Sequence, residues 1–156
     1  MLLAKKIVKI LTKKKLTIAC AESCTGGMVS SAITGINGSS KVFILGLIVY
    51  SNKSKINVLK ISQNIIKKYG GVSKQVCAAM AKNVKKIAKT NISLSVTGVA
   101  GPSGGTQKKP VGLVYIGIKK GNKIKVKRYL FKNKKRAHIR KSTVNKSLEL
   151  IMRSLK

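Results

Sequence analysis

One stretch of the chain combines a hydroxyl, a carboxylate and glycines, residue types that nucleophilic chemistry uses. Residues 17–27 read Thr-Ile-Ala-Cys-Ala-Glu-Ser-Cys-Thr-Gly-Gly, so a short apolar strand runs directly into a polar turn. Helical spacing follows, and the backbone N–H groups at the start of a helix favour anions. Ser23 lies in this turn beside Glu22, one of only two carboxylates in the chain. We predict that the chemistry is here, although the same residues also suit a capped helix start without a catalytic role.

A second candidate is the glycine-rich segment 97–106, which follows an apolar strand. Ligands of open α/β sheets bind where strands end, and four glycines within residues 98–105 suggest that backbone approaches a ligand closely. The segment lacks the Lys-Ser/Thr of a P-loop and the spacing of a dinucleotide fingerprint. A binding loop and a plain mobile loop both fit. The segment 50–55 also follows an apolar run, but a lysine in this chain usually marks a solvated surface, so alone it indicates little.

The scarcity of some residue types argues against other chemistry. The chain has one histidine, His138, and two acids, Glu22 and Glu149, with no aspartate. Metal-dependent hydrolysis and paired-carboxylate catalysis therefore lack their usual groups, and we expect no metal and no cofactor. A serine triad would need His138 with Glu149, and Cys24 as nucleophile would have only His138 as its base. We expect neither arrangement, and we expect His138 on the surface of the last helix.

The charge of the chain is extreme, because 34 Lys and Arg face two Glu and give a formal net charge of +32. A nucleic-acid binder and a general lysine bias both fit this composition. The lysines are spread over the whole chain, and only four cations are arginines and six residues aromatic, whereas specific nucleic-acid readers use both types. The pattern favours the general bias. Weak, non-specific binding to nucleic acid at low salt is expected in either case.

Apolar periodicity and turn residues predict a single α/β domain over residues 1–156, with three layers and a mixed β-sheet with helices on both faces. The run 42–50 is expected to be an interior strand, and it is too short to span a membrane. Three cysteines without metal-type spacing indicate reduced thiols and a cytoplasmic protein. The expected helices cover residues 2–15, 25–34 and 136–155, and a further long helix is capped by Ser73 and carries apolar residues between 76 and 88 on one face. Two short helices are also expected: one capped by Ser51 or Asn52 and carrying Lys55, the other capped by Ser62 and ending at Gly70. The expected strands cover residues 17–21, 42–50, 92–97, 111–119 and 124–131.

Several motifs stand in one order along the chain: Ala-Glu-Ser-Cys-Thr-Gly-Gly, Gly-Ser-Ser, Tyr-Ser-Asn with a lysine five after the tyrosine, Gly-Gly-Val-Ser, Thr-Gly-Val-Ala-Gly-Pro-Ser-Gly-Gly-Thr and Lys-Pro-Val-Gly-Leu-Val-Tyr-Ile. Together they resemble the CinA C-terminal domain family, the nicotinamide-nucleotide amidohydrolases, over nearly the whole chain. The resemblance implies hydrolysis of the carboxamide of nicotinamide mononucleotide to nicotinate mononucleotide and ammonia, without a metal. It also implies a homo-oligomer, and a stand-alone form without the N-terminal domain of larger CinA proteins.

The resemblance also assigns roles to residues of this chain. Ser23 would be the nucleophile, Lys55 the general base, and Tyr50 would relay or orient the proton. A serine needs such a base, and a lysine can serve when burial and nearby positive charge lower its pKa. Backbone N–H groups of residues 24–27 are candidates for an oxyanion hole. Further substrate-binding positions implied by the family or by the loops are Ser40, Thr25, Gly26, Thr97, Gly98, Gly101, Arg136 and Arg140.

Two departures from the family pattern matter. The stretch before the last helix reads Asn-Lys-Lys-Arg where the family has Gly-Asp-Arg, so both Arg136 and Arg140 stay open as the phosphate ligand. Gln107 and Lys108 stand where the family has acidic residues. These losses leave an alternative function open: a catalytically degraded member that acts as a nucleotide- or nucleic-acid-binding module.

Overall fold

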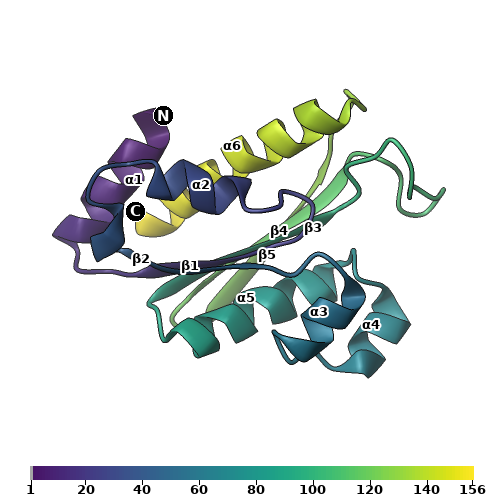
Figure 1. Ribbon diagram of the computed structural model, residues 1–156, viewed down its shortest axis with the longest axis horizontal. Helices are drawn as coiled ribbons and strands as arrows, with labels where there is room; N and C mark the ends of the chain where they lie inside the picture. Colours follow the sequence, from purple (N-terminus) through teal and green to yellow (C-terminus); the bar gives the residue numbers. More distant parts are fainter. Residues whose placement is uncertain (1) are drawn as a thin grey trace.

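The computed structural model describes residues 2–156; Met1, the first residue of the predicted domain, lies outside them. Helices and strands alternate up to the second strand, three successive helices then lead to the third strand, and a β-hairpin and a long helix complete the chain (Figure 1). The elements are α1 (Leu2–Lys13), β1 (Ile18–Glu22), α2 (Met28–Thr34), the 3₁₀ turn η1 (Ser39–Lys41), β2 (Phe43–Ile48), α3 (Asn52–Asn57), α4 (Gln63–Tyr69), α5 (Lys74–Ala88), β3 (Ile92–Gly98), β4 (Leu113–Lys120), β5 (Lys123–Leu130) and α6 (Arg136–Leu155).

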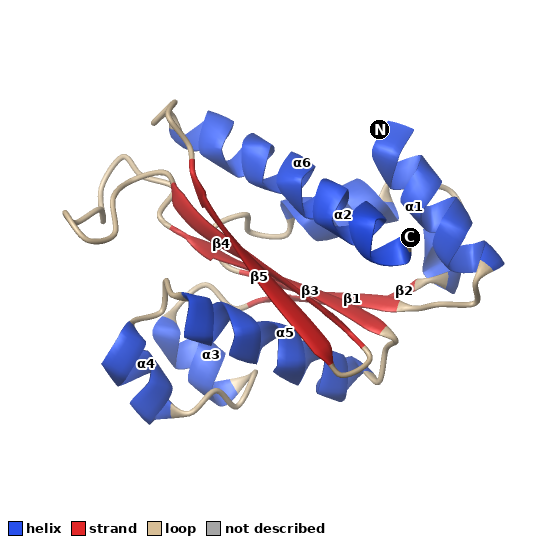
Figure 2. Ribbon diagram, turned by 180° about the vertical axis from the view of Figure 1, so that it is seen from behind, coloured by secondary structure: helices blue, strands red, loops and turns tan. Residues whose placement is uncertain are grey.

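The five strands form one mixed sheet in the order β2-β1-β3-β4-β5. β1 pairs in parallel with both β2 and β3, whereas β3–β4 and β4–β5 are antiparallel. Helices α1, α2 and α6 cover one face, and α3, α4 and α5 lie on the other (Figures 1 and 2). The predicted α/β class, with a mixed sheet between two helical layers, is confirmed.

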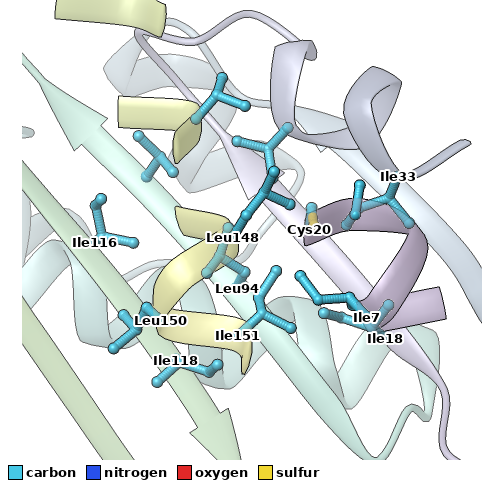
Figure 3. Close-up of a cluster of buried hydrophobic side chains, with 14 of the residues drawn as sticks. Ile7, Ile18, Cys20, Ile33, Leu94, Ile116, Ile118, Leu148, Leu150 and Ile151 are labelled. Carbon is cyan, nitrogen blue, oxygen red and sulfur yellow. The ribbon is translucent and has the colours of Figure 1, made fainter. Parts of the chain in front are cut away.

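The larger core lies between the sheet and the layer of α1, α2 and α6. Ile7 of α1, Ile18 of β1 and Ile151 of α6 meet there without exposure to solvent (Figure 3). Burying each such side chain stabilises the fold by about 1.5–3 kcal/mol. A second cluster, built on Ala19, Ala21 and residues of α5, fixes the opposite face. The central strands are therefore held rigidly from both sides.

The prediction that residues 42–50 form an interior strand was wrong, because β2 lies at an edge of the sheet. Its residues alternate between half-buried and exposed, and Ile44 and Ile48 are 51% and 58% exposed. A continuous apolar run is typical of a strand covered on both faces. Here the helices cover β2 only in part, and composition alone does not reveal that.

The helix expected from residue 25 begins three residues later, at Met28. Gly26 and Gly27 have φ values of +58° and +92°, in the left-handed region that helix residues do not adopt. The segment between β1 and α2 is therefore a tight turn that carries Ser23 at its start. Because β1, β2 and β3 are parallel, their carboxyl ends lie at the same end of the sheet. This turn and the segments that follow β2 and β3 therefore meet there.

In the part of the chain that the structure describes, none of the helices combines the length and apolar character needed to cross a lipid bilayer.

Candidate active site

A cavity of about 260 Å³ lies at the carboxyl ends of the parallel strands. The turn after β1, the start of α3 and the end of β3 form its walls, and the first turn of α6 contributes one cation. The sequence-predicted site residues that line it are Ser23, Tyr50, Lys55, Thr97, Gly98 and Arg136. The structure therefore brings together residues that are up to 113 positions apart in the sequence.

Ser23, Lys55 and the backbone carbonyl of Tyr50 form a closed set of polar contacts. Lys55 Nζ lies 3.2 Å from Ser23 Oγ and donates to the Tyr50 carbonyl oxygen at 3.1 Å. Ser23 Oγ lies 3.3 Å from the same carbonyl oxygen. A neutral lysine amine at this position can accept the serine proton while the carbonyl holds its direction.

Lys55 reaches Ser23 because α3 begins directly after Tyr50. Ser51 caps this helix by accepting a hydrogen bond from the Ser54 N–H at 3.0 Å, as the sequence led us to expect. Lys55, one turn into the helix, then points back into the cavity and is only 3% exposed. Burial lowers the pKa of the Lys55 ammonium below its ordinary value, because the charged form loses water. We had expected the general positive charge to contribute, but burial alone is the cause that lowers it.

Glu22 is fully buried and holds the turn that carries Ser23. Its carboxylate accepts hydrogen bonds from the backbone N–H groups of Gly27, Val29 and Ser30 at 3.0, 3.1 and 2.7 Å, and from the Ser30 hydroxyl at 2.6 Å. The Glu22 carboxylate is therefore the anion that binds the free N–H groups at the start of α2. Among the backbone N–H groups of residues 24–27 expected as oxyanion donors, that of Gly27 is therefore already bound to Glu22.

The side chain of Tyr50 has a different partner from the one we expected. It is 57% exposed, and its hydroxyl oxygen accepts a hydrogen bond from Arg136 NH2 at 3.0 Å. Arg136 NH1 donates to the Gly101 carbonyl at 2.9 Å, so the guanidinium joins the rim of the cavity to the glycine-rich loop. Tyr50 thus orients Lys55 through its backbone carbonyl, and its phenol lies with Arg136.

Arg140 lies behind the turn and does not line the cavity. Its Nε and NH2 donate to the carbonyls of Cys24 and Thr25 at 3.1 and 2.9 Å. A Cβ on Gly26 would lie 3.3 Å from Arg140 NH2, so the glycine leaves room for this contact. Thr25 is buried, and its hydroxyl has no hydrogen-bond partner among the described residues. Of the two arginines left open by the sequence, Arg136 lines the cavity and Arg140 does not.

The glycine-rich loop contributes only its first residues to the cavity. Thr97 is buried and donates from its hydroxyl to the Gly71 carbonyl at 2.8 Å, which joins the end of β3 to the segment before α5. Gly101 has a φ of +71°, and a Cβ there would lie 2.5 Å from Val111 Cγ1, so it serves close packing and does not line the cavity. The loop beyond it projects away from the sheet (Figure 1).

Other candidates lie away from the cavity or are inert. Ser40 is exposed in η1, before β2 begins, whereas the cavity lies beyond the end of β2, so the chain does not bring Ser40 to the site. His138 is exposed on α6, as expected. Glu149 forms an ion pair with Lys146 at 2.9 Å, so no triad forms around Ser23. Cys24 does line the cavity, but burial raises the pKa of its thiol to about 12, which leaves it a poor nucleophile at neutral pH.

Four lining residues were not assigned from the sequence: Asn52, Gly71, Val72 and Ala100. A Cβ on Gly71 would lie 2.1 Å from Asn52 Oδ1, so a glycine is needed where Asn52 enters the cavity wall. Both lie within motifs that the sequence had singled out, Tyr-Ser-Asn and Gly-Gly-Val-Ser. The two motifs are therefore the sequence signal for these two lining residues. Among residues 2–156, there is no group of three or more His, Cys, Asp and Glu side chains placed to hold a metal.

Comparisons with known proteins agree with this arrangement. A family model described as the CinA C-terminal domain matches residues 2–155. The chain belongs to the CinA C-terminal domain family. A competence-damage inducible protein of Thermoanaerobacter pseudethanolicus is 44% identical over 149 residues, and one of Clostridium botulinum strain Kyoto is 46% identical over 155 residues. The matches cover 96% and 99% of this chain but only 36% and 38% of those proteins, so the chain spans less than two fifths of their length.

Solved CinA-family structures have the same fold. The competence/damage inducible protein CihA from Agrobacterium tumefaciens superposes with a TM-score of 0.94 at 36% identity, covering 98% of this chain and 93% of that protein. A CinA superfamily protein from Enterobacter cloacae gives a TM-score of 0.94 at 30% identity, covering 99% and 90%. The family membership and the fold predicted from the motifs are therefore confirmed.

Proposed function

We propose that this protein is an amidohydrolase that converts the carboxamide of nicotinamide mononucleotide to the carboxylate, with release of ammonia. The observation that supports this most is the 3.2 Å contact between the Ser23 hydroxyl and a lysine amine whose pKa is lowered by burial. A degraded, non-catalytic member would have no reason to keep a desolvated lysine beside a serine. Such a lysine is costly to bury, and its amine is useful as a base.

The first half of the proposed reaction forms an ester on Ser23. Neutral Lys55 takes the hydroxyl proton as Oγ bonds to the carboxamide carbon. Lys55 then gives that proton to the amide nitrogen, the C–N bond breaks, and ammonia leaves. The Tyr50 carbonyl accepts a hydrogen bond from Nζ throughout and keeps the amine directed at Ser23.

The second half regenerates the serine. Water attacks the ester carbon and gives a proton to Lys55, which returns it to Ser23 Oγ as the C–O bond breaks, and the carboxylic acid product forms. In both halves the negative oxygen of the tetrahedral intermediate needs donors. The backbone N–H groups of Cys24 and Thr25, in the turn after Ser23, have no partner among the described residues and can supply them.

The size of the cavity suggests how a nucleotide binds. Its volume of about 260 Å³ is slightly below the range of typical ligand pockets, roughly 300–1,000 Å³. It suits the amide-bearing ring, with the ribose phosphate outside at the rim. Arg136 lies at that rim and can bind a phosphate through two parallel hydrogen bonds.

The test is a substrate panel with the purified protein. Ammonia release is measured from nicotinamide mononucleotide, from nicotinamide riboside, which lacks the phosphate, and from free nicotinamide. We expect the mononucleotide to have the highest kcat/KM and the riboside a value about 10–100-fold lower, which is the cost of a lost charged contact of about 1.5–3 kcal/mol. No ammonia from any of the three would contradict the proposal.

A further inference from the structure

A second hollow, the cationic groove, lies at the other end of the sheet. It has a volume of about 950 Å³ and runs between the β4–β5 turn, the C-terminal end of α6 and the segments that precede β1 and β3. Figure 2 shows the C-terminus and the turn of the hairpin at the end of the sheet away from α3. It shares no lining residue with the active-site cavity. Any ligand of this groove therefore leaves the proposed amidase site free.

Six cations line the cationic groove, and they are Lys85, Lys120, Lys123, Lys125, Lys127 and Arg153. Lys120 donates to the Ser154 carbonyl at 2.7 Å, whereas the side chains of the other five make no hydrogen bond to a described residue. Both acids of the chain are engaged elsewhere, since Glu22 is buried under α2 and Glu149 pairs with Lys146. No acidic side chain lines the groove, which therefore holds a concentrated positive charge.

The arrangement of these cations is more regular than a general lysine bias requires. Lys123, Lys125 and Lys127 occupy alternate positions of the edge strand β5, so they share one face at a spacing of about 6.8 Å. In the β4–β5 register, Lys125 stands opposite Ile118, which also lines the groove. Arg153 lines the same groove from α6.

The floor of the cationic groove is apolar. Leu16, Ile118 of β4 and Leu150 of α6 line it; Leu16 is half-buried, and the other two are almost fully buried. A row of cations beside apolar side chains is a combination used by proteins that bind single-stranded nucleic acid, in which cations contact phosphates and bases lie on apolar surface. A duplex keeps its bases stacked inside and gains nothing from that floor.

We propose that the cationic groove binds single-stranded nucleic acid without sequence preference. The proposal does not depend on the amidase activity, because the two sites share no residue. It differs from the diffuse low-salt attraction that the net charge of +32 gives to the whole surface, since it assigns the binding to one groove.

The test compares two variants that lose the same charge. One replaces the groove row (K123Q, K125Q and K127Q), and the control replaces three exposed lysines of α1 (K5Q, K6Q and K9Q). The probe is a fluorescein-labelled oligothymidylate of about 12 nucleotides, within the range of known single-strand site sizes, titrated by anisotropy at several salt concentrations. We expect the groove variant to bind at least tenfold more weakly than wild type near physiological salt. Its slope of log affinity against log salt should fall by about 2, because each lost phosphate contact removes about 0.7.

A second variant and a second probe sharpen the test. K85Q with R153Q removes cations from the other elements that line the groove and should also weaken binding, whereas the α1 control should stay within about twofold of wild type. Equal losses in the groove and α1 variants, or tighter binding of a duplex of the same length, would overturn the proposal, as would the absence of binding near physiological salt. Circular dichroism of each variant, measured in the same samples, reports whether the protein is folded.

Discussion

The two ends of the sheet use the same side chain in opposite ways. At the carboxyl end, Lys55 is 3% exposed, contacts a serine and has a lowered pKa. At the amino end, Lys123, Lys125 and Lys127 are exposed on an edge strand beside a wide groove. Desolvation favours the neutral amine of Lys55, which can act as a base. The three exposed lysines stay hydrated and keep the charged form that binds phosphates. Burial, more than residue type, decides what a lysine does in this protein.

The position of each end follows from the strand directions. Because β1, β2 and β3 are parallel, the three segments that follow them lie at the same end of the sheet, where they line a small cavity. The antiparallel β4–β5 hairpin needs only a short turn at the opposite end, and β5 has no further strand beside it. The groove beside β5 is therefore the larger of the two hollows, at about 950 Å³ against about 260 Å³ for the cavity.

The largest effect is expected for Ser23→Ala, which removes the proposed nucleophile. Ammonia release from nicotinamide mononucleotide should fall by about 10³-fold or more, because water alone would have to attack the amide. Binding of the oligothymidylate at the other end should be unchanged. Ser62→Ala is the matched control, since Ser62 is exposed and makes no side-chain capping bond to α4. A Ser23→Ala protein with wild-type turnover would remove Ser23 from the mechanism.

One substitution made at both ends tests the comparison directly. Lys55→Met should lower kcat by about 10²–10⁴-fold, the usual contribution of a general base, and leave oligonucleotide affinity intact. Lys125→Met should weaken oligonucleotide binding and leave kcat unchanged. If both variants lost only oligonucleotide affinity, Lys55 would be an ordinary surface-type cation and the contrast between the two ends would fail.

The lowered pKa of Lys55 also predicts a dependence of stability on pH. Unfolded Lys55 regains its ordinary pKa near 10.4, so between the lowered folded value and about 10.4 the unfolded chain binds more protons. Stability contributed by this group should therefore rise with pH across that window, and below the window the fold bears the full cost of a buried ammonium. Urea unfolding of wild type and Lys55→Met at several pH values should show the difference between them changing in this direction. A difference that is constant with pH would contradict it.

A smaller effect, on stability, is expected for Glu22→Gln. The carboxylate accepts four hydrogen bonds in a fully buried site, and an amide nitrogen there would face backbone donors. We expect a loss of about 2–4 kcal/mol in the free energy of unfolding, with reduced ammonia release because the Ser23 turn loosens. Glu149→Gln, which breaks an exposed ion pair, should cost less than about 1 kcal/mol and affect neither site. Similar losses in the two variants would show that Glu22 has no special structural role.

Much of the fold could be predicted from local signals. The last helix was expected over the residues that α6 occupies, because its apolar spacing and length are unambiguous. Ser51 and Ser73 cap α3 and α5 as their residue types suggest. The edge position of β2 could not be predicted in this way, because it depends on which strands pair, and pairing is a long-range property.

The site shows the same division. The motifs identified Ser23 and Lys55, but not that the Tyr50 backbone carbonyl holds the amine and that its phenol binds Arg136. They also placed Glu22 next to Ser23 without giving it a role, whereas in the fold its carboxylate binds the backbone at the start of α2. Lys55 is one lysine among 30, and only three-dimensional burial separates it from the rest.

The most direct test of this account is an NMR titration of the lysine side chains. With ¹³C in the ε-position of every lysine, the Lys55 resonance is assigned by its absence from the Lys55→Met spectrum and followed as the pH is raised. We predict that it titrates with a midpoint below the ordinary lysine value of about 10.4. A Lys55 resonance that titrates at or above that value would contradict the claim that burial makes this lysine the base of the reaction.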